Sequence, residues 1–197
     1  MVAHLVTLYV CCAVYANLRY VVFNPKNLEH IPVFVMNKGM SMGAALCFSL
    51  AFWVQWRLAR GAQPAVAPAL WFRGGLFGVF MHVPMSLAIL QPAYFKEFFH
   101  ESGRLSFQGE AVFFFGALAL GGLYLLTRTD WSPRHRWQLS LAAMLTLFTH
   151  TLFMGISRGI NFNASHGYLP PMWMLSLFGI AAGVAYLLMS RPKVAAA

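Results

Sequence analysis

The stretch WQLSLAAMLTLFTHTLFMGI, residues 137–156, is an almost unbroken apolar run. About 20 such residues in a helix cross the hydrocarbon layer of a bilayer, so the stretch predicts a transmembrane helix. It also carries His150 deep inside the run. A strongly polar side chain at that depth is costly and indicates a function, which makes His150 the starting point for the rest of the chain.

The whole chain shares the character of this stretch. Of its 197 residues, 59% are hydrophobic and 10% are charged, which is more apolar surface than a soluble domain of this size can bury. We therefore predict an all-α membrane protein in which residues 1–197 form a single transmembrane domain. Breaks rich in Pro, Asn and charge divide it into six predicted spans, residues 2–23, 33–56, 70–90, 110–127, 137–156 and 171–190.

The formal net charge is +9, which in a soluble protein would suggest nucleic acid as a partner. Here the basic residues lie mainly in short connections between apolar runs, so we expect a lipid bilayer and no nucleic acid. The side that holds both termini carries eight Lys and Arg residues, against five on the other side, where four of the five acidic residues lie. The positive-inside rule then places both termini in the cytoplasm.

The seven histidines differ in depth. Five lie near span ends or in connections, where a solvated or interfacial side chain is sufficient explanation: His4, His30, His100, His135 and His166. The other two, His82 and His150, lie in spans that run in the same direction. Both fall about 18–20 Å from the inner boundary at about 1.5 Å of rise per residue. Two imidazoles at one height on parallel helices are the arrangement that a six-coordinate b-type haem needs, so we expect both to ligate its iron.

Small residues precede both histidines on the same helix faces. Gly74 and Gly78 lie two turns and one turn before His82, and a bulky side chain there would collide with a porphyrin. Thr146 lies one turn before His150 in a similar stripe. Ordinary helix packing is the alternative explanation of such stripes. For the histidines the alternatives are a hydrogen bond to a neighbouring helix and a proton or ion pathway.

Three segments resemble bacterial members of the ferric reductase-like transmembrane family, relatives of the membrane half of NADPH oxidases. They are PAYFKEFFHESGRLSFQGEAVFFFGALAL (92–120), WQLSLAAMLTLFTHTLFMG (137–155) and GYLPPMWMLSLFG (167–179), and the likeness covers roughly residues 33–190. The resemblance implies a six-helix bundle whose third and fifth helices carry the axial histidines of haem b. By position, His82 and His150 match one such pair.

The chain also departs from the family pattern. Members with two stacked haems repeat the histidine about four helical turns away on each helix. Here those places hold Pro68 or Ala69 and Arg136 or Trp137, so we expect one haem only. Arg158, at the outer end of the fifth span, is a candidate for a haem propionate, with interfacial anchoring as the alternative.

The resemblance implies a membrane cytochrome b-like subunit, a multi-pass protein of the bacterial inner membrane that relays electrons. Since the chain ends soon after its last span, we expect another polypeptide to supply the flavin and nicotinamide domain of an oxidoreductase, as a redox partner protein or as part of a larger membrane complex. Two alternatives stand beside this hypothesis. One is a non-catalytic subunit that has lost haem, and the other is a small channel or transporter that uses the intramembrane histidines.

Overall fold

The computed structural model describes residues 2–23, 28–29, 31–158 and 166–192. The long helices are α1 (Val2–Asn17), α2 (Met36–Ala59), α3 (Pro68–Ala88), α4 (Phe107–Leu125), α5 (Pro133–Gly155) and α6 (Met172–Met189). π-helical turns continue α1 (Leu18–Val22) and lead into α2 (Ile31–Val35), and 3-10 turns occupy Lys96–Phe98 and Ile156–Arg158. The part of the chain that the structure describes is therefore helical, as predicted.

Five helical segments are long and apolar enough to cross a membrane: Val2–Val22, Ile31–Ala59, Phe107–Leu125, Pro133–Gly155 and Met172–Met189. The chain is accordingly a multi-pass integral membrane protein. The third predicted span is the exception. The structure describes α3 throughout, and its length is sufficient, but it is not among the segments of sufficient hydropathy. The physical reason is that Arg73, His82 and several Gly and Pro residues dilute its apolar side chains.

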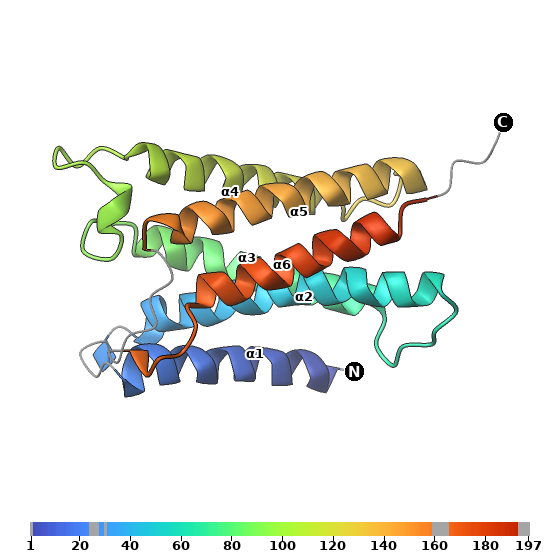
Figure 1. Cartoon of the computed structure of the whole chain (residues 1–197), viewed down its shortest axis with the longest axis horizontal. Helices are drawn as coiled ribbons and strands as arrows, with labels where there is room; N and C mark the ends of the chain where they lie inside the picture. The colour runs from blue at the N-terminus through green and yellow to red at the C-terminus, as the bar shows by residue number, and fades with distance from the viewer. Residues whose placement is uncertain (1, 24–27, 30, 159–165, 193–197) are drawn as a thin grey trace.

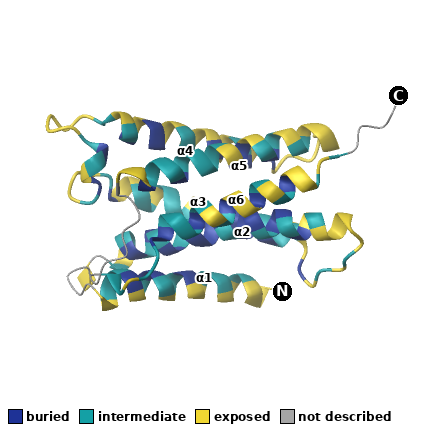
Figure 2. Ribbon diagram, in the orientation of Figure 1, coloured by how far each residue is buried: buried dark blue, intermediate teal, exposed yellow. Residues whose placement is uncertain are grey.

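Helix α2 is the centre of the bundle (Figure 1). It packs against α1, α3 and α6, while α5 packs against both α4 and α6. Figure 2 shows buried residues along most of α2, whereas α1 exposes much of its surface. Glycines permit the close contacts between these helices. A Cβ on Gly75 of α3 would lie 2.6 Å from Phe48, and one on Gly183 of α6 would lie 2.8 Å from Met144. Phe48 and Met144 are fully buried at this core.

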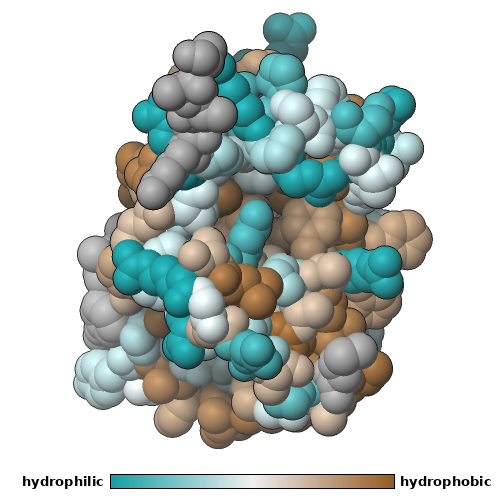
Figure 3. Space-filling model, turned by 90° about the vertical axis from the view of Figure 1, so that its right-hand side faces the viewer, coloured by the Kyte–Doolittle hydropathy of each residue, from teal (hydrophilic) through white to brown (hydrophobic). Residues whose placement is uncertain are grey.

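Helix α1 begins and α6 ends at the same end of the bundle, which we call the terminal end (Figure 1). Both α3 and α5 also begin there, so they run in the same direction. Figure 3 looks onto this end, where hydrophilic side chains gather in patches between hydrophobic ones. Arg60 and Arg191 lie there over the rings of Trp56 and Trp137, at 4.3 and 5.5 Å from the ring centres. Such Arg and Trp pairs are typical of the edge of a membrane span.

The connection between α3 and α4 covers the opposite end of these two helices. Phe95 and Phe98 of this connection stack on each other, with ring centres 5.2 Å apart, and they pack in one apolar cluster with Val112 of α4 and Phe153 of α5. Ser106 caps α4 by accepting a hydrogen bond from the backbone N–H of Gly109. This cluster therefore fixes α4 and α5 next to the end of α3, in the region of the two deep histidines.

Candidate functional site

His82 is held by a polar cluster between α2 and α3. Its Nδ1 atom lies 2.6 Å from Oδ1 of Asn37, and Nδ2 of Asn37 donates to Oγ of Ser86 at 3.0 Å. Asn37 is only 2% exposed. Since the Asn37 oxygen can only accept, Nδ1 of His82 carries the proton. The Nε2 atom of His82 is therefore the unprotonated nitrogen of the ring.

His150 is held by the backbone of α4. Its Nδ1 atom donates to the carbonyl oxygen of Val112 at 2.8 Å, and a carbonyl oxygen can only accept. Nε2 of His150 is therefore also the nitrogen with a free lone pair. Gly116 makes this approach possible, because a Cβ at that position would lie 2.9 Å from Nδ1 of His150. Any larger residue would displace the ring.

Local sequence explains where these partners sit. The π-helical turn Ile31–Val35 feeds directly into α2, so that Asn37 lies in its first turn and is buried against α3. Ser86 follows His82 by one helical turn and lies on the same face of α3. Between them, Pro84 is accommodated without ending α3, which continues to Ala88. The three polar side chains thus come from two packed helices at one level.

The structure brings the two histidines together. His82 lies within electrostatic range of both His150 and Lys38. The ammonium of Lys38 lies 5.3 Å from the ring centre of Phe34 and 5.1 Å from that of Phe95, under the α3–α4 connection. Both histidines are half-buried. Parallel helices α3 and α5 therefore each carry one imidazole in this region, and that the two rings share a ligand stays a prediction.

The candidate site contains two imidazoles, those of His82 and His150. Within the described ranges, no group of three or more His, Cys, Asp or Glu side chains lies close enough to hold a metal ion. Zinc and similar ions take four or more ligands, usually three of them from the protein. Two imidazoles whose Nε2 atoms are unprotonated, that of His82 lying 3.4 Å from Oγ of Ser86, would instead suit a metal that arrives with most of its ligands already bound. The nitrogen–oxygen contacts at Nδ1 are those that orient metal-binding histidines in proteins.

The predicted glycine stripe of α3 faces α1 and α2. A Cβ on Gly74 would lie 2.5 Å from Leu5, and one on Gly78 would clash with the hydroxyl of Tyr9. That hydroxyl donates to the carbonyl oxygen of Gly74 at 2.8 Å. Side chains of neighbouring helices therefore fill the space beside both glycines. This is the helix packing that the sequence left open as the alternative to a porphyrin face.

Two further predicted residues are Thr146 and Arg158. Thr146 donates within its own helix, to the carbonyl oxygens of Ala142 and Ala143 at 3.0 and 2.9 Å. Its hydroxyl proton is thus directed to the α5 backbone. The backbone of Arg158 ends the 3-10 turn after α5, and its side chain lies outside the described part of the chain. The propionate prediction for Arg158 stays a prediction.

The sequence analysis missed four groups of the site: Asn37, Ser86, Gly116 and the Val112 carbonyl. Two of them carried a signal. A polar Asn37 inside a predicted span, and a Ser86 one turn after a suspected ligand, both fit the rule that polar groups in a membrane point to a site. Gly116 is one of several glycines in α4, and a backbone carbonyl has no signature in a sequence.

Comparison with known proteins adds no relative. A scan against protein-family models matched none of them, and a search among curated proteins found no significant similarity. The resemblance to ferric reductase-like proteins therefore stays a prediction from the sequence.

Proposed function

We propose that this protein is a membrane cytochrome b-like subunit that binds one haem b between His82 and His150 and relays electrons to or from partner proteins. The observation that carries the proposal is the oxygen that contacts Nδ1 of each ring, because it sets the tautomer of that ring. Each histidine has Nδ1 within hydrogen-bond distance of an oxygen that can only accept, at 2.6 Å for His82 and 2.8 Å for His150. Nε2 is thereby left unprotonated in both rings, and Oγ of Ser86, 3.4 Å from Nε2 of His82, would have to yield to a metal there.

The number of ligands supports haem over a bare ion. A pair of imidazoles leaves most coordination positions of a free metal ion to water, which is scarce among apolar helices. Haem b would supply one-electron redox chemistry and most of the ligands of its iron, so that the protein would need to provide only two nitrogen atoms. His82 and His150 would provide these atoms from α3 and α5.

Residues of the chain itself orient the two histidine rings. Asn37 and Ser86 hold the His82 ring in one tautomer, and the Val112 carbonyl does the same for His150. An Nδ1–H that donates to oxygen makes the ring a more basic ligand, which stabilises the oxidised form of a bound metal. The apolar cluster of Phe95, Phe98 and Phe153 limits the access of water from the nearer end of the bundle.

The test is the absorption spectrum of the purified protein. Dithionite should produce the sharp Soret and alpha bands of a reduced b-type haem, and the double variant His82→Ala, His150→Ala should lack them. The matched control is His135→Ala, whose exposed ring lies at the terminal end with Nδ1 3.0 Å from Ser132 Oγ, and it should keep the bands. A full haem spectrum in the double variant would contradict the proposal.

A second candidate is a non-catalytic subunit of a larger membrane complex. It is favoured by the fact that the same contacts join helices, since His82 and Asn37 connect α3 to α2 and His150 connects α5 to Val112 of α4. Hydrogen bonds of this kind stabilise packed transmembrane helices by about 0.5–2 kcal/mol. A colourless preparation that co-purifies in fixed ratio with other subunits would decide for it.

A further inference from the structure

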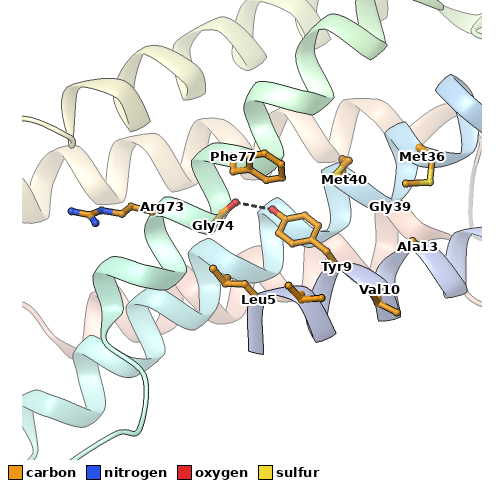
Figure 4. A pocket seen from close by; sticks show the side chains of 11 residues that line it. Leu5, Tyr9, Val10, Ala13, Met36, Gly39, Met40, Arg73, Gly74 and Phe77 are labelled. Carbon is orange, nitrogen blue, oxygen red and sulfur yellow. Dashed lines mark hydrogen bonds between the residues drawn. The ribbon is translucent and has the colours of Figure 1, made fainter. Parts of the chain in front are cut away.

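An apolar groove of about 460 Å³ runs between α1 and α3 on the outer surface of the bundle (Figure 4). Its walls are almost entirely apolar and include Val6 and Val10 of α1, Met40 of α2 and Phe77 of α3. The volume falls in the range of roughly 300–1,000 Å³ that is typical of ligand sites. No part of the site formed by His82 and His150 lines it.

The groove is open to the surrounding lipid along one side. Val6, Val10 and Phe77 are 55%, 53% and 55% exposed and form its lips. Its floor is closed by Tyr9, which reaches from α1 to α3 and donates to the Gly74 carbonyl at 2.8 Å (Figure 4). Because that contact satisfies the hydroxyl proton, the floor offers an apolar ring to an occupant.

One end of the groove is blocked and the other is charged. Helices α1 and α2 approach so closely at the blocked end that a Cβ on Gly39 would lie 3.3 Å from the Cα atom of Ala13. Arg73 lies at the other end, and Figure 4 shows its side chain pointing away from Phe77 and Tyr9. Side chains of a helix lean toward its N-terminus, which for α3 is the terminal end of the bundle.

Arg73 has no counter-charge within the described ranges. Its side chain is exposed and makes no hydrogen bond or ion pair with any residue there. A guanidinium at the edge of a membrane span suits a phosphate group, to which it can donate two parallel hydrogen bonds. Basic positions between transmembrane helices bind anionic lipid headgroups in this way.

We infer that the groove binds an anionic phospholipid, with one acyl chain between α1 and α3 and the headgroup phosphate at Arg73. The shape favours this occupant over a second copy of the chain. The walls extend along α1 from Leu5 to Ala13, about 12 Å at 1.5 Å per residue, which is only part of the roughly 30 Å over which two membrane-spanning helices can pack. The inference does not depend on haem, because no residue of the proposed haem site takes part.

The test uses the full chain in nanodiscs of equal parts phosphatidylglycerol and phosphatidylcholine with identical acyl chains. After release into detergent, native mass spectrometry counts the retained lipids. Wild type should keep phosphatidylglycerol in preference to phosphatidylcholine. Arg73→Gln should reduce that preference about fivefold, the equivalent of one arginine near a membrane surface. Arg134→Gln, an exposed arginine at the start of α5 and outside the groove, should leave the preference unchanged.

A second pair of variants tests the acyl chain. Val10→Trp places an indole in the groove and should reduce the retention of both lipids, whereas Val14→Trp, 51% exposed on the same helix and outside the groove, should not. Equal retention of the two lipids by wild type, an unchanged preference in Arg73→Gln, or a dimer that protects the groove would overturn the inference. If Val10→Trp fails to fold by circular dichroism, the exposed Arg73→Gln variant still decides.

Discussion

The two histidines of the candidate site are anchored by different kinds of oxygen. His82 contacts the side chain of Asn37, which donates a hydrogen bond to Ser86. A single substitution can therefore remove the partner of the His82 ring. His150 contacts the backbone carbonyl of Val112, which every residue at position 112 would provide. The position of the His82 ring therefore depends on the Asn37 side chain. The position of the His150 ring depends on the absence of a side chain at Gly116.

This difference predicts where each half of the site is vulnerable. The α2–α3 half should fail when a polar partner is deleted. The α4–α5 half should fail when volume is added. Both failures should be visible in the stability of the protein whether or not a cofactor is bound, because the contacts are made by the chain itself.

The largest effect is expected for Gly116→Val. The added side chain collides with the His150 ring, 2.9 Å from a Cβ at this position, and should lower the free energy of unfolding in detergent by about 1–3 kcal/mol. The control is Gly121→Val on the same helix, where a Cβ meets nothing within 4 Å. Equal losses of stability in the two variants would show that the close approach at Gly116 is not what holds His150.

A smaller effect is expected for Asn37→Ala. The substitution removes the partner of His82 Nδ1 and should cost about 0.5–2 kcal/mol, the range of hydrogen bonds between membrane helices. Asn17→Ala is the matched control, because in the described part of the chain Asn17 Nδ2 donates to the Ala13 carbonyl of its own helix. Thermal unfolding in detergent should separate the two variants, and an Asn17→Ala loss as large as that of Asn37→Ala would remove the special role of Asn37.

The smallest effect concerns His166, which lies between α5 and α6. Burial and, next, the Arg19 guanidinium lower its pKa, while a contact with the Arg19 carbonyl at 3.4 Å acts in the opposite direction. The unfolded chain therefore binds this proton at a higher pH than the folded chain, and stability should fall as the pH is lowered from 7.5 through about 6.5. His166→Gln should weaken this dependence of the unfolding midpoint, and His135→Gln should keep it. An identical slope in His166→Gln and wild type would contradict the assignment.

The helices could be predicted because they follow from long apolar runs, and the two deep histidines could be singled out within those runs. A run of about 20 apolar residues is a strong signal, and a histidine within it is visible as an exception. α5 begins at Pro133 rather than Trp137, because Ser132 caps it and accepts from the His135 N–H. Such a cap extends the helix beyond the apolar run, so hydropathy alone does not locate its start.

The function of the glycines could not be predicted, because a glycine only shows that space is needed. Gly74 and Gly78 were assigned to a cofactor face, yet Leu5 and Tyr9 occupy that space. Gly116 has the same chemistry and does lie against a histidine. Which neighbour approaches a glycine depends on packing between distant segments, which no local pattern records.

The central proposal is that His82 and His150 hold one haem. The direct measurement is the haem content per chain of the purified wild-type protein, by pyridine haemochromogen absorbance against amino-acid analysis. One haem per chain, lost in both His82→Ala and His150→Ala, is the predicted result. A content near zero under haem-replete expression, or of two haems per chain, would contradict it.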